Sequence, residues 1–280
     1  MKVSNGEWIA ELSGNKKITD LKSTDLKNGN LDNEECGPKK PKTFKEDSWD
    51  TIANAVRTGQ TSNYHVGDEK EVDLGTYGKH NVRISNMSTP DECSQNGFSQ
   101  SACGFVIEFT DIITTHNMNP KGEYKGKTYD YGWNLDGWPA SQMKAFIDND
   151  IYNSLPNELK SVIITTETVS GHGSGDTNNF TSSDNLYLLA PKEIYANWSN
   201  QYDTARDKTR QLDYYNSKGV TTNSYAAAIK KDSTKTASNW WLRCAYSNNI
   251  GAFYAMGSIG TWGYNAASNV NGVSPAFRIG

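Results

Sequence analysis

The sequence predicts an α+β fold in which short strands and long loops surround two helices. Only 35% of the 280 residues are hydrophobic, yet the chain holds 8 Trp, 15 Tyr and 8 Phe. Disordered chains are poor in aromatic residues, so this composition indicates a loop-rich globule. Segments with strand-like alternation are also interrupted by segments with helical periodicity, which is typical of an α+β domain.

Helical periodicity is clearest after residue 140. Ser141 can act as an N-cap, and four apolar residues follow on one helical face: Met143, Phe146, Ile147 and Ile151. Pro156 suits a first helical turn, and a second apolar face follows it: Leu159, Val162 and Ile163. An earlier helix is expected between Ser48 and Gly59, with one apolar face: Trp49, Ile52, Ala53 and Val56.

Strand signals are short and spread over the rest of the domain. Residues 71–74, 81–84 and 104–109 show alternation or β-rich content, and 185–191 is expected to be a buried strand. Between 165 and 185 Gly, Ser, Thr and Asn predominate, which predicts a surface loop.

Two parts are expected along the chain, a polar N-terminal arm or stalk at residues 1–45 and one domain at 46–280. Residues 192–236 are polar and interrupted, which predicts an insertion with a short helix around 225–229. No apolar run reaches the ~20 residues that a membrane helix needs, so direct membrane insertion is not expected. The first residues also lack the pattern of a signal peptide, and we expect the chain to be a mature fragment.

The charge and the cysteines exclude several classes of partner. A net charge of −4 gives no reason to expect nucleic-acid binding. Cys36, Cys93, Cys103 and Cys244 form no CxxC pair and the four His are scattered, so no metal site and no cofactor are expected. Cys93 and Cys103 flank a short polar loop and are a candidate disulfide, which would fit an oxidising compartment. Two free buried thiols are the alternative, and Cys244 is expected to be buried.

The C-terminal stretch has an unusual composition. The 34 residues from Cys244 to Phe277 contain no Asp, Glu, Lys or Arg, although the chain is 21% charged. Tyr, Asn, Gly, Ala and Ser take their place, as in antibody paratopes, where rings supply contact area and small polar residues adapt their hydrogen bonds. The candidate ligand-binding residues are Tyr246, Asn248, Asn249, Ile250, Phe253, Tyr254, Ile259, Trp262, Tyr264, Asn265, Asn269 and Asn271.

A buried core hairpin is the alternative interpretation of this stretch, because a core would also lack charge. That interpretation suits Trp241, Leu242 and Phe277, but a core needs aliphatic residues, which are scarce here. Burying so many asparagines would leave amides unpaired at a cost of about 1–3 kcal/mol each. We therefore expect the candidate residues to point into solvent.

Motifs on both sides of this stretch resemble a known family. They are residues 137–143 (Gly-Trp-Pro-Ala-Ser-Gln-Met), 239–243 (Asn-Trp-Trp-Leu-Arg) and 272–279 (Gly-Val-Ser-Pro-Ala-Phe-Arg-Ile). Over residues 46–280 the chain resembles a bacterial and phage family of C-type-lectin-like domains. The resemblance implies a C-type-lectin-like fold with short twisted sheets, two helices and long loops. Cys244 departs from the pattern, because relatives often carry Ser there.

Many members of that family resemble the variable proteins of diversity-generating retroelements. In those systems a reverse transcriptase copies a template with errors at adenines and writes the copy into the 3′ end of the gene. The resemblance implies a rigid scaffold with a variable region at 245–271, in which Met256 and Trp262 would be fixed template positions. It implies a binding protein and not an enzyme, with an unknown protein or glycan partner on another cell or virion. The expected location is extracellular, on the cell surface (anchored or pilin-like), or in a phage virion.

Three alternatives remain beside this interpretation. Formylglycine-generating enzymes share the lectin-like fold and use reactive cysteines, but no His follows His172 to activate Cys244. A calcium-dependent sugar lectin could use the oxygen-rich residues 176–185, although these lack EF-hand spacing and no Glu-Pro-Asn signature occurs. A structural, pilin-like surface subunit would fit the polar arm, and is compatible with binding.

Overall fold

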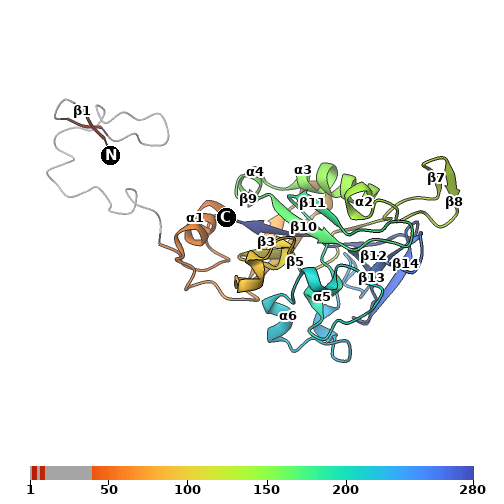
Figure 1. The fold of residues 1–280 in the computed structure, drawn as a ribbon. Helices are drawn as coiled ribbons and strands as arrows, with labels where there is room; N and C mark the ends of the chain where they lie inside the picture. Colours follow the sequence, from red (N-terminus) through yellow and green to blue (C-terminus); the bar gives the residue numbers. More distant parts are fainter. Residues whose placement is uncertain (1, 5–6, 10–39) are drawn as a thin grey trace. The chain divides into compact units, whose positions relative to one another are not determined.

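A computed structural model describes residues 2–4, 7–9 and 40–280 and divides the chain into two units, Met1–Lys40 and Pro41–Gly280. In the first unit, β1 (Lys2–Ser4) pairs antiparallel with β2 (Glu7–Ile9) (Figure 1). Most of the expected arm, and Cys36 with it, lies outside the described residues. The second unit has mixed α+β structure, with mostly short strands and few helices, as the sequence predicts.

The first five-stranded sheet of the second unit contains the last strand of the chain. Its order is β3-β4-β5-β16-β9, and every neighbouring pair is antiparallel. The strands are β3 (Glu69–Asp73), β4 (Lys79–Asn86), β5 (Val106–Phe109), β16 (Ala276–Ile279) and β9 (Ile163–Ile164). Thus β16 joins segments that lie more than a hundred residues earlier in the chain.

The second five-stranded sheet is built mainly from the C-terminal stretch. Its order is β14-β13-β12-β15-β6, in which β12 and β15 are parallel and the other pairs are antiparallel. The strands are β14 (Trp262–Ala266), β13 (Ala252–Met256), β12 (Trp240–Ala245), β15 (Asn271–Val273) and β6 (Thr114–His116). Two hairpins complete the strands: β7 (Gly122–Tyr124) with β8 (Lys127–Tyr129), and β10 (Thr166–Ser170) with β11 (Phe180–Asp184).

Two of the helices begin at the caps that the sequence predicts. Ser48 and Ser141 accept the backbone N–H groups of Thr51 and Lys144, and Gly59 ends the first helix with φ 69°. From α2, a π-helical segment, Ile147–Ile151, leads into α3. The α-helices are α1 (Trp49–Thr58), α2 (Gln142–Phe146), α3 (Tyr152–Ser154), α4 (Asn157–Lys160), α5 (Pro191–Ile194) and α6 (Asp213–Ser217).

Four expectations about individual elements are wrong in part. The helix expected after Pro156 ends at Lys160, and Ile163, expected on its apolar face, lies in β9. Residues 165–185 are not one loop, because β10 and β11 pair within them and leave only the tip irregular. Residues 186–190 are buried as expected but form only an isolated bridge, between Tyr187 and Ala276. The helix expected around 225–229 is a single 3₁₀ turn, Ala226–Ala228.

Buried polar groups fix the strand that leads into the C-terminal stretch. The Trp240 and Trp241 indole N–H groups donate to the carbonyls of Ala228 and His116. The fully buried Arg243 guanidinium lies 2.6 and 2.7 Å from the two carboxylate oxygens of Glu193, which is buried too. These contacts explain the Trp-Trp-Leu-Arg motif as a structural anchor for β12.

Candidate ligand-binding face

The C-terminal stretch forms an exposed surface, but from fewer residues than the sequence predicts. Within residues 40–280, six large hydrophobic side chains are exposed, and five of them lie in this stretch. Val270 is one of the five and was not among the candidates. We define the C-terminal face as the exposed residues Asn248, Ile250, Ile259, Trp262, Tyr264, Asn269 and Val270.

Four candidate residues do not point into solvent, and that part of the prediction is wrong. Tyr246, Phe253, Tyr254 and Asn271 are all buried, with Phe253 and Tyr254 at 0% exposure. Phe253 and Tyr254 are neighbours on β13, so they point to opposite sides of the sheet. Because β13 lies between β12 and β14 and both sides are covered, a tyrosine there belongs to the core.

Residues 198–200 supply the cover on the Tyr254 side. The Trp198 ring packs edge-on against Tyr254 with centroids 5.4 Å apart, and the Tyr254 hydroxyl donates to Asn200 Oδ1 over 3.2 Å. Burial raises the pKa of the Tyr254 hydroxyl well above its usual value. We expected a core to need aliphatic residues. Around Tyr254, aromatic edge contacts and one hydrogen bond take their place.

Exposed rings of the C-terminal face rest on buried rings. Tyr264 stacks on Tyr246 with centroids 4.1 Å apart and planes 7° apart. Trp262 packs edge-on against Trp198 at 5.2 Å, and Tyr246 contacts Tyr202 at 5.2 Å. Since the buried rings restrict the exposed ones, the face offers contact area that loses little conformational entropy on binding.

The two remaining asparagines are half-buried, and Asn249 helps to form the turn before β13. Its side-chain oxygen accepts the backbone N–H of Gly251 over 3.0 Å. The buried Asn134, which sequence reasoning missed, holds the same turn. Its Nδ2 atom lies 2.8 Å from the Ala252 carbonyl and 3.1 Å from the Asn249 carbonyl. Asn265, on β14, lines the neighbouring pocket.

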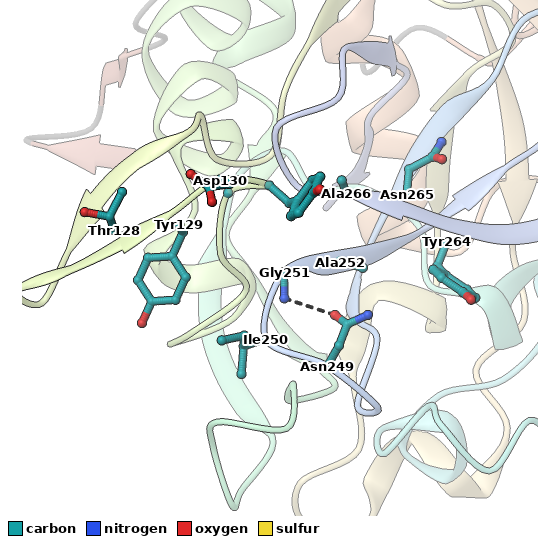
Figure 2. A pocket seen from close by; sticks show the side chains of 12 residues that line it. Thr128, Tyr129, Asp130, Asn249, Ile250, Gly251, Ala252, Tyr264, Asn265 and Ala266 are labelled. Atoms are coloured by element: carbon teal, nitrogen blue, oxygen red, sulfur yellow. Dashed lines mark hydrogen bonds between the residues drawn. The ribbon is translucent and has the colours of Figure 1, made fainter.

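A pocket of about 480 Å³ opens beside the C-terminal face. One wall is the segment 128–132, and the other consists of 249–252 and 264–266 (Figure 2). Residues 128–132 were not among the predicted site residues. Their aromatic and glycine content, Tyr-Asp-Tyr-Gly-Trp from residue 129, was the available signal. Tyr131, the sixth exposed large hydrophobic residue, is 69% exposed.

The three cysteines within residues 40–280 are all buried. Cys93 and Cys103 form a disulfide, the pairing suggested by their spacing. Cys244 is fully buried, and burial raises the pKa of its thiol well above the usual value. The thiolate is the nucleophilic form of cysteine, so this environment opposes activation.

Two searches within residues 2–4, 7–9 and 40–280 give negative results. No group of three or more His, Cys, Asp or Glu side chains is arranged to hold a metal ion. None of the helices there combines the length and the apolar character needed to cross a bilayer.

The stability of the domain should depend on the buried rings and not on the exposed ones. We expect Phe253→Ala to lower the free energy of unfolding by about 3–5 kcal/mol, because a fully buried ring leaves a cavity. Tyr264→Ala, half exposed at the sheet edge, should cost less than about 1 kcal/mol. Urea denaturation of both variants measures the difference, and equal costs would contradict the division of the C-terminal stretch into core and surface.

Comparison with known proteins gives a family without an assigned activity. No curated protein and no solved structure matches the chain. The family model described as "Domain of unknown function (DUF6273)" matches residues 110–280, which include both walls of the pocket and the whole C-terminal face. The chain therefore belongs to the DUF6273 family.

Proposed function

We propose that the protein is a ligand-binding protein that recognises a receptor or another surface through its C-terminal face. The observation that carries the proposal is the concentration of exposed large hydrophobic side chains in one uncharged stretch. Such apolar groups scattered evenly over the chain need no explanation, but their concentration in β14 and the turns next to β13, β14 and β15 favours an interaction site. The proposed partner is a protein or glycan on another cell or virion.

We further propose that this face is diversified on a C-type-lectin-like scaffold, as in the variable protein of a diversity-generating retroelement. The exposed positions could vary without loss of fold, since little packs on top of them. Tyr246, Phe253, Tyr254 and Asn271 are left out of the proposed variable set because they are buried. The buried Arg243–Glu193 pair and the tryptophan pair support the role of β12 as a constant scaffold.

In this proposal the protein is not an enzyme and needs no cofactor. The raised thiol pKa and full burial of Cys244 disfavour the formylglycine-generating alternative. The disulfide between Cys93 and Cys103 supports an oxidising location, and we propose the extracellular space, the cell surface or a virion. A pilin-like subunit would be compatible with binding through the same face.

A display experiment tests the capacity for diversified binding. One phage library randomises exposed candidates, and a second randomises buried ones. We expect most members of the first to remain resistant to protease and to yield binders to a probe such as lysozyme, and most of the second to unfold. The first library covers Asn248, Ile250, Ile259, Tyr264 and Asn269, and the second Tyr246, Phe253, Tyr254 and Asn271.

A third library on exposed positions of α1, Asp50, Arg57 and Thr58, controls for binding by any exposed surface. If it yields binders as often as the first library, which randomises the exposed candidates, the C-terminal face is not a special binding surface.

The retroelement proposal is tested separately by sequencing the DNA around the gene. It requires a near-copy of the segment that encodes 245–271, differing mainly at adenines, beside a reverse transcriptase gene. Constant C-termini in many isolates without such a repeat would leave only a static binding domain.

A further inference from the structure

We infer that the pocket between 128–132 and the C-terminal face receives a cationic side chain, lysine or arginine, from a protein partner. The inference rests on the proposed binding function for the identity of the partner. The pocket itself is described by geometry alone: its volume of about 480 Å³ is large enough for one long side chain. The residues that line the pocket also determine whether it binds a cation or an anion.

Hydrogen bonds from residues next to each wall to the opposite wall hold the pocket in place before any ligand arrives. The Ser268 N–H donates to the Tyr131 carbonyl over 3.0 Å, and the Asn134 N–H donates to the Ile250 carbonyl over 2.8 Å. At Gly132, with φ 73°, a Cβ atom would approach the Asn119 carbonyl to 2.4 Å, so the turn needs glycine. A preformed pocket avoids part of the ordering cost of binding.

Asp130 is the single formally charged residue that lines the pocket. Its exposed carboxylate makes no hydrogen bond or ion pair with any other side chain in the described part of the chain. No Lys, Arg or His lines the walls, and the C-terminal stretch adds no charge of either sign. The pocket therefore attracts cations and repels anions at close range.

The other lining residues suit the rest of a lysine or arginine side chain. Tyr129 and Tyr131 contribute aromatic rings, whose faces attract cations. Ile250, Ala252 and Ala266 offer apolar surface to an alkyl stem. A neutral sugar could also use rings and amides, but it would gain less from the charge of Asp130.

A titration with short peptides tests the inference without the natural partner. The ¹⁵N-labelled protein is titrated with acetyl-Gly-Arg-Gly-amide, and the same peptide with Gln or Glu at the centre serves for comparison. We expect the Arg peptide to shift amide signals of 128–132 and 249–252 and to bind more tightly than the Gln peptide. Asp130→Asn should weaken binding of the Arg peptide about fivefold, the upper range for an exposed charge pair.

Two further measurements make the outcome decisive. Glu92→Gln, an exposed carboxylate outside the pocket, should leave the affinity unchanged, and Tyr131→Ala should weaken it. Equal affinity for the Arg and Gln peptides, or no effect of Asp130→Asn, would overturn the inference. So would a neutral disaccharide that shifts the same signals when the Arg peptide does not. Such a failure does not contradict the proposed function if the phage library that randomises the exposed candidates still yields binders.

Discussion

Glu193→Gln should lower the free energy of unfolding by about 3–5 kcal/mol. Arg243 and Glu193 are both fully buried, and the guanidinium donates to both carboxylate oxygens. Removing the negative charge leaves the Arg243 cation without compensation in a region that water does not reach, which is the costly way to break a buried ion pair. Chemical denaturation followed by tryptophan fluorescence measures the loss.

The control for this variant is an exposed pair of the same kind. Asp207→Asn removes the carboxylate that lies 3.3 Å from Arg206, and its cost should stay below about 1 kcal/mol. If Glu193→Gln does not fold, the double variant Glu193→Leu/Arg243→Met keeps the prediction testable. It should recover folding at least in part, because apolar residues can replace a buried pair. An unfolded double variant and a stable Glu193→Gln would both contradict our account of β12.

Glu108 should make the domain sensitive to acid. Burial opposes ionisation of this carboxyl, but Arg83 and Lys230 outweigh burial and lower its pKa from 4.5 to about 2. Arg83 Nε lies 3.0 Å from Oε1, and Lys230 Nζ lies 2.8 Å from Oε2. The stability that the ionised group contributes is therefore complete above pH 4.5 and is lost as the pH falls towards 2. At ~1.36 kcal/mol per pH unit, the loss is ~3 kcal/mol.

The variant Glu108→Gln separates this group from the other carboxylates. It should lose about 3–5 kcal/mol near neutral pH, because two buried cations lose their counter-ion. Its free energy of unfolding should then fall less steeply than that of the unmodified protein between pH 4.5 and 2. Burial lowers the pKa of Lys230 to about 8, so Lys230 stays protonated throughout this window and adds no slope. Glu71→Gln, in the exposed pair with Lys79, is the matched control, and an equal acid slope in both variants would refute the assignment.

Local signals predicted the parts of the fold that depend on neighbouring residues. The caps at Ser48 and Ser141, and the disulfide between Cys93 and Cys103, each depend on groups within about ten positions. The pairing of β16 with β5 joins Phe277 to Ile107, and no periodicity within either segment reveals such a partner.

The errors at the candidate site have one physical cause. Exposure of a residue depends on what other parts of the chain lie over it, and composition does not show this. Tyr254 and Tyr264 pair across neighbouring strands, yet one is fully buried and the other 51% exposed. Trp198, from an insertion that sequence reasoning left without a role, accounts for part of the difference.

The position of β16 inside the first sheet has a consequence for protein synthesis. The strand that joins β5 to β9 lies at residues 276–279, so the first sheet cannot close until the ribosome has released these residues. A chain that stops before residue 276 lacks β16 and leaves the facing edges of β5 and β9 unpaired, and unpaired strand edges favour aggregation.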